Sequence, residues 1–119
     1  MSEAQEQAAL IQWAQMQSSR YPALKWIYHT PNGGSRHPAE ARHLKQQGLK
    51  AGVPDLTLPY PAGGRHGLYI EMKYGRNRPT ELQREWLAYL DSVGYATAVC
   101  YSAEEAANVI MDYLKGKPK

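Results

Sequence analysis

The sequence predicts an α/β fold in which a mixed β-sheet of about four strands is flanked by helices. Segments with helical periodicity alternate along the chain with short runs of branched and aromatic residues. A short turn rich in Gly and Pro joins two of the predicted strands, which favours an antiparallel pair. A helix separates the last strand from the one before it, and such a crossover favours a parallel pair.

The first predicted element is a helix over residues 2–19. Ser2 suits its N-cap because a serine oxygen can accept a hydrogen bond from the first helical turn. Leu10 and Trp13 belong to an apolar stripe with helical spacing. Pro22 marks the end of the helix, because proline is disfavoured in a helix interior.

Two strands with a short basic helix between them are predicted next. Residues 25–30 are rich in aromatic and branched side chains, a composition typical of a strand. The helix is predicted at residues 38–47 and ends before Gly48. A short strand is predicted at residues 53–58.

The second half of the chain is predicted to contain two strands and two helices. Residues 67–73 alternate between apolar and polar side chains, as a strand does, and follow the Gly- and Pro-rich turn. A helix is predicted at residues 80–93, a buried strand at residues 95–101, and a last helix that Ser102 caps. The predicted order of elements is therefore α-β-α-β-β-α-β-α.

Length and composition predict a single domain over residues 1–119. The chain is 43% hydrophobic and 21% charged, which is typical of a soluble globular protein. No apolar stretch approaches the roughly 20 residues of a membrane-spanning helix, and the first ten residues hold two acids and no basic residue, unlike a signal peptide. The one cysteine, Cys100, excludes an internal disulfide and a cysteine-built zinc site. We therefore expect a cytoplasmic protein with no membrane partner.

The charge distribution permits a nucleic-acid partner. The formal net charge is +3, and the basic residues concentrate in the middle of the chain, whereas the acids gather near the two ends. A basic segment of this kind is compatible with phosphate binding, although a solubilising surface has the same composition.

One group of polar residues suggests chemistry. Strand alternation places Glu71 and Lys73 on one face of the strand at 67–73, and it places Asp55 on one face of the strand before it. If these strands pair, Asp55 and Glu71 converge, and two carboxylates together suit Mg²⁺ or Mn²⁺. Taken alone, Glu-x-Lys also fits a solvated strand face, and Asp55 fits a turn or edge residue.

The combination resembles a known nuclease family. Pro54-Asp55 followed by Glu71-Met72-Lys73 resembles the PD-(D/E)XK nuclease signature. Asn32-Gly33-Gly34, the segment at residues 48–55 and a glutamine in the next helix are similar to the VRR-NUC branch, the virus-type replication-repair nucleases. The resemblance covers residues 6–101 and implies a restriction-endonuclease-like fold.

The resemblance also implies roles for single residues. It makes Asp55 and Glu71 metal-binding carboxylates, with the backbone carbonyl of Met72 as a further ligand, and it makes Lys73 the catalytic lysine. Glu6 resembles the acid that the first helix supplies in many members, and Gln83 resembles the family's glutamine near the active centre.

Two of these residues have an alternative interpretation. Glu6 lies on the same helix face as Leu10 and Trp13, so either it has a buried partner such as a metal, or it is an exposed acid favoured by the helix dipole. Thr80 and Gln83 have the spacing of a capping box, so Gln83 has either a capping role or a role in the site.

The resulting hypothesis is a Mg²⁺- or Mn²⁺-dependent DNA endonuclease. The family resemblance implies an enzyme similar to Holliday junction resolvases, which act as homodimers on branched DNA, in a bacterial or phage-infected host cell. The alternatives are a less specific restriction-type nuclease and a nucleic-acid-binding module without catalysis. The candidate contacts to DNA are Asn32, Arg36, Lys50, Arg76 and Arg78.

Overall fold

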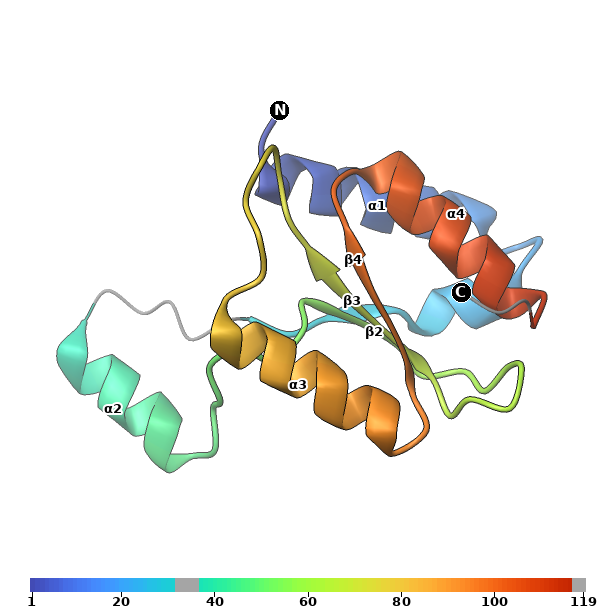
Figure 1. The fold of residues 1–119 in the computed structure, drawn as a ribbon. Helices are drawn as coiled ribbons and strands as arrows, with labels where there is room; N and C mark the ends of the chain where they lie inside the picture. Colours follow the sequence, from blue (N-terminus) through green and yellow to red (C-terminus); the bar gives the residue numbers. More distant parts are fainter. Residues whose placement is uncertain (32–36, 117–119) are drawn as a thin grey trace.

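A computed structural model describes residues 1–31 and 37–116 of the chain (Figure 1). Its elements are α1 (Glu3–Gln17), the 3-10 helix η1 (Pro22–Trp26), β1 (Tyr28–His29), α2 (Pro38–Gln46), β2 (Leu56–Leu58), β3 (Leu68–Met72), α3 (Glu81–Ser92), β4 (Ala96–Cys100) and α4 (Ala103–Leu114). The order of helices and strands confirms the predicted α/β class. Across these described ranges, no helix is both long enough and apolar enough to cross a membrane.

The four strands form one mixed sheet in the order β1-β2-β3-β4. β2 is antiparallel to both β1 and β3, whereas β3 and β4 are parallel. The two pairings of β3 follow from the connections, because a short turn links β2 to β3 and the helix α3 links β3 to β4.

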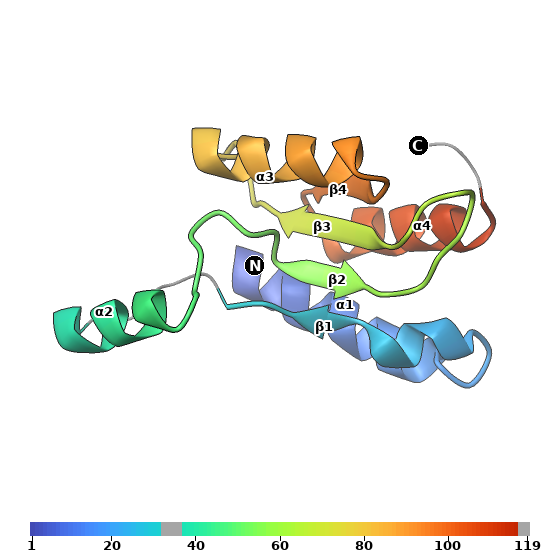
Figure 2. The ribbon, with the colours of Figure 1, turned by 90° about the horizontal axis from the view of Figure 1, so that it is seen from below.

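The helices form layers on the two sides of the sheet. α1 and α4 lie side by side on one side, and α3 lies on the other, next to β4 (Figures 1 and 2). The core lies under α1 and α4, where Leu56, Ile70 and Met72 pack with Leu10 and Ile110. The alternate strand positions, including Glu71, therefore face away from this core.

The strand predicted at residues 25–30 is mostly absent. Residues 22–26 instead form η1, with Pro22 in its first turn and the N–H of Ile27 bonded to the carbonyl of Leu24. Proline presets the backbone angle of such a turn, and this local preference outweighs the strand propensity of Trp26. The strand is reduced to Tyr28–His29.

The second strand is also shorter than predicted, because β2 begins at Leu56 and not at residue 53. Pro54 has no N–H to give to a neighbouring strand. Pairing nevertheless extends one residue beyond β2, since the N–H of Thr30 donates to the carbonyl of Asp55 at 2.8 Å.

The segment that leads into Asp55 packs tightly against α3 at Gly52. Gly52 has a φ of +87°, and a Cβ added there would lie 2.8 Å from Cγ of Leu82 and 3.1 Å from its backbone carbonyl carbon. Gly48 has a φ of +104° with nothing within 4 Å of the same position. Of these two glycines, Gly52 is therefore the one that the contact between this segment and α3 requires.

We expect Gly52→Ala to destabilise the protein more than Gly48→Ala. Both substitutions place an L side chain in the left-handed region, at a cost of about 1–2 kcal/mol. Gly52→Ala adds overpacking against α3, which costs about 1–3 kcal/mol more. Urea unfolding of the two variants measures this difference, and equal free energies of unfolding would contradict the role of the contact.

Candidate active site

Asp55 and Glu71 face each other across β2 and β3. The register pairs Leu56 with Ile70, and continued by one residue it sets Asp55 opposite Glu71. Oδ2 of Asp55 accepts a hydrogen bond of 2.7 Å from the N–H of Met72. Both carboxyl groups are buried, Asp55 being 5% exposed and Glu71 1%. The register therefore brings together the two carboxylates that the sequence predicts to converge.

Lys73 lies beside this pair, directly after β3. Its Nζ is 3.8 Å from Oε2 of Glu71, and the residue is 9% exposed. Its backbone N–H donates to the carbonyl of Cys100 at 2.9 Å, which anchors this end of β3 to β4. The predicted trio of Asp55, Glu71 and Lys73 is thus assembled at one end of the sheet.

Glu71 is held in an unfavourable environment for a charged group. Its pKa is raised to about 8, first by burial and then by the charge of Asp55 and hydrogen bonding to it, while Lys73 acts in the opposite direction. Oε1 of Glu71 is buried and has no hydrogen-bond partner among residues 1–31 and 37–116. A buried acceptor without a partner is costly, and a bound cation would remove both this cost and the repulsion.

The donor set fits a hard divalent cation. Mg²⁺ in proteins is typically bound through one or two carboxylates and keeps positions for water and for phosphate oxygens of the substrate. Asp55, Glu71 and the backbone carbonyl of Met72 would hold such an ion. Within residues 1–31 and 37–116, no three His, Cys, Asp or Glu side chains are grouped so that they could hold a metal. The two carboxylates are thus the core of this candidate site.

Glu6 has a hydrogen-bond partner at the start of α4. Its Oε1 accepts a hydrogen bond of 2.9 Å from the N–H of Ala103, the first residue of α4. The bond joins α1 to the start of α4 and satisfies a helix N–H that lacks an intrahelical partner. The expectation of a partner for Glu6 is met, but by a helix end.

Glu3 is the acid of α1 whose charge acts on Glu71, since it contributes to the raised pKa of that residue. Helical periodicity by itself assigns Glu3 no role in the site. The available signal was its position three residues before Glu6, which places both acids on neighbouring positions of one helix face.

Gln83 forms the capping box at the start of α3. Its N–H donates to Oγ1 of Thr80 at 3.2 Å, and its Oε1 accepts from the N–H of Thr80 at 2.8 Å. This confirms the capping interpretation of the Thr80 and Gln83 spacing.

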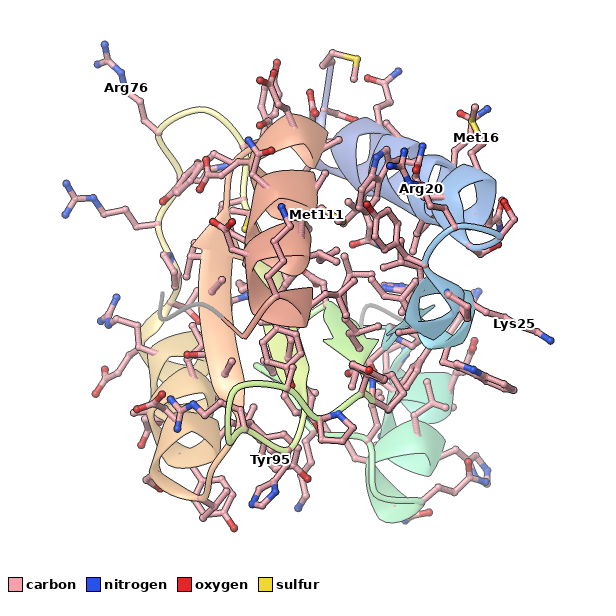
Figure 3. All side chains as sticks on the ribbon, turned by 90° about the vertical axis from the view of Figure 1, so that its right-hand side faces the viewer. Met16, Arg20, Lys25, Arg76, Tyr95 and Met111 are labelled. Carbon is pink, nitrogen blue, oxygen red and sulfur yellow. The ribbon has the colours of Figure 1, made fainter. Side chains whose placement is uncertain are left out.

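Three of the five predicted DNA contacts lie within the described residues. Lys50, Arg76 and Arg78 are exposed, and Figure 3 shows Arg76 extending into solvent from the loop between β3 and α3. That loop follows Lys73 directly, so both arginines lie on the segment that leaves the site. Asn32 and Arg36 lie outside the described residues.

The fold and the site together define a class of protein. A mixed sheet with an aspartate before one strand and Glu-x-Lys on its antiparallel neighbour is the arrangement of the PD-(D/E)XK nucleases. The family model described as the VRR-NUC domain matches residues 1–104. The chain belongs to this family of nucleases.

The structural comparison agrees with the family. A solved structure named "VRR_NUC domain protein" superposes with a TM-score of 0.84 and is 31% identical, covering 98% of this chain and 91% of that one. A comparison with curated proteins found no match.

We expect Gln83→Ala to destabilise the protein and Gln83→Glu to be nearly neutral. Alanine removes the side-chain half of the capping box, at a cost of about 0.5–1 kcal/mol, whereas glutamate preserves it. Thermal unfolding of both variants measures the effect. Equal stability of Gln83→Ala and the wild type would contradict the structural contribution of this bond.

We expect the pH dependence of stability without metal to change in Glu71→Gln. Below the ordinary pKa of 4.5, Glu71 is protonated in both the folded and unfolded protein, so its contribution to stability is fully present. As the pH rises through about 8, folding must bury the charge, and this stability is lost. Urea unfolding in EDTA between about pH 5 and about pH 9 should therefore show a smaller loss of stability for Glu71→Gln. Parallel pH profiles would contradict the raised pKa.

Proposed function

We propose that this protein is a metal-dependent, structure-specific DNA endonuclease that hydrolyses phosphodiester bonds in branched DNA, as Holliday junction resolvases do. The observation that supports this proposal best is the pairing of the buried Asp55 and Glu71 carboxylates with Lys73 beside them. The expected cofactor is Mg²⁺ or Mn²⁺, because hard oxygen donors favour these ions.

Each residue has a part in this mechanism. Asp55, Glu71 and the Met72 carbonyl hold the ion, which when bound neutralises charge on the phosphate and lowers the pKa of a water. Lys73, a cation close to Glu71, donates a hydrogen bond to the attacking water or to a phosphate oxygen. The hydrogen bond from Met72 orients Asp55 toward Glu71. Glu6 and Gln83 support the site by fixing the starts of α4 and α3.

The surroundings of the site suit a polyanion. α3 and α4 follow the ends of two parallel strands and therefore begin at the same end of the sheet as Lys73. The N-terminus of a helix favours negative charge. Lys50, Arg76 and Arg78 supply exposed positive charge, and we propose that they contact phosphates together with Asn32 and Arg36.

The symmetry of a four-way junction suggests the assembly. Two cuts on a two-fold symmetric substrate require two related active sites, and a homodimer with two-fold symmetry provides them. We therefore propose a homodimer that acts in DNA repair or recombination in the cytoplasm of a bacterial or phage-infected cell.

The test is cleavage of a labelled synthetic four-way junction beside matched duplex and single strands, in EDTA, Mg²⁺ or Mn²⁺. We expect paired nicks in the junction that depend on the metal. Asp55→Asn keeps an acceptor for the Met72 N–H but removes the charge, and it should lower the rate at least about 100-fold. Lys73→Ala should lower the rate about 10²–10⁴-fold.

Glu104→Ala is the matched control, because Glu104 is an exposed acid on α4, and its rate should equal that of the wild type. Equal cleavage of all DNA substrates would favour the less specific restriction-type nuclease. Binding without cleavage, unchanged in Asp55→Asn and in EDTA, would overturn the enzyme proposal and favour a binding module.

A further inference from the structure

Among the residues that the structure describes, no helix or strand packs closely on α2. None of its residues is buried, and it projects away from the sheet and from the other helices (Figures 1 and 2). Ala41 and Leu44, three positions apart, are only half-buried. A helix of nine residues is marginal in water by itself, since most helical stability comes from packing. α2 therefore requires a surface to pack on.

The outer face of α3 is an apolar surface that stays partly exposed in the described part of the chain. Leu82, Trp86 and Tyr89, together with Glu85, line an open groove of about 270 Å³. Leu82 is 44% exposed and Tyr89 is 59% exposed. The indole N–H of Trp86 donates to the carbonyl of Ala51 at 3.1 Å, which fixes one wall of the groove.

The spacing of this surface suits a helix. Leu82, Trp86, Tyr89 and Val93 follow one another at intervals of four, three and four residues, and Val93 is 42% exposed. Apolar residues at these intervals form the seam along which one helix packs against another. The spacing of these residues therefore suits a helical occupant that presents apolar residues, as α2 does with Ala41 and Leu44.

The charges of the two helices are complementary. α2 carries Arg42 and Lys45 against the single acid Glu40. Beside the groove, α3 carries Glu81 and Glu85, which are four positions apart on one helix face. Arg84, the one basic residue of α3, donates to the carbonyl of Pro79 at the start of the helix. Charge complementarity of this kind directs an association and suppresses wrong partners.

We propose that α2 of one copy of this chain packs into the α3 groove of a second copy, and that the second copy does the same in return. Within one chain α2 does not cover this groove, because none of its residues is buried. A reciprocal contact is isologous and closes as a two-fold dimer. The inference rests on the homodimer proposed above and identifies the interface of that dimer. The test of the inference measures association of the chains and not DNA cleavage.

The test uses charge reversal on the two surfaces separately. Arg42→Glu/Lys45→Glu reverses the charge of α2, and Glu81→Lys/Glu85→Lys reverses the charge of α3. All four side chains are exposed. We expect the wild type to sediment as a dimer and each double variant to dissociate at least about tenfold more readily. An equimolar mixture should restore dimers, because both contacts of the mixed pair are again between opposite charges.

The control is Arg20→Glu/Lys25→Glu, the same change of charge in the turn after α1 and in η1 (Figure 3). It should remain dimeric. Circular dichroism of each variant establishes that the fold is intact. Leu44→Asp is a second variant, which disrupts the apolar part of the same contact.

Three outcomes overturn the inference. They are a monomeric wild type, a dimer that both reversals leave intact, and reversed variants that the mixture does not restore. A loss of DNA affinity in Arg42→Glu/Lys45→Glu with an unchanged dimer would instead assign α2 to the nucleic acid. Because the measurement needs no cleavage, a failed nuclease assay and a failed dimer assay are distinguishable.

Discussion

The arrangement of the site depends on the register between β2 and β3. That register sets Asp55 opposite Glu71, and the hydrogen bond from the Met72 N–H to Asp55 holds the carboxylate in place. A slip of one residue would turn Glu71 toward the apolar side of the sheet and place Ile70 or Met72 opposite Asp55. The apolar residues that pack under α1 and α4 prevent this slip, so the core determines the geometry of the site.

This geometry has a cost in the metal-free protein. Two carboxyl groups are buried together, and burial and the nearby Asp55 raise the pKa of Glu71 to about 8. In the described part of the chain, Oε1 of Glu71 also has no hydrogen-bond partner. Burial of like charges destabilises a fold unless a cation or a proton compensates. The site therefore lowers the stability of the protein and creates an environment that favours positive charge. Lys73 supplies part of this positive charge.

Local patterns were sufficient for much of the fold. Apolar alternation located β3, serine and threonine located the starts of α1, α3 and α4, and the connections predicted how β3 pairs with β2 and with β4. The strand prediction at residues 25–30 was wrong over most of its length for a local reason as well, because the turn that begins at Pro22 competes with strand propensity. Short apolar and aromatic runs are compatible with either structure until their packing is known.

The sequence by itself determined the fold class and the face that Glu71 shares with Lys73, since both depend on residues close together in the chain. Only the tertiary structure decided the partners of the acids in α1. Glu6 bonds to Ala103, 97 positions away, whereas the charge of Glu3 acts on Glu71. Only the tertiary structure showed that none of the residues of α2 is buried and that Leu82 and Tyr89 of α3 are exposed. Periodicity tells which face of a helix is apolar, but what covers that face depends on packing between distant segments.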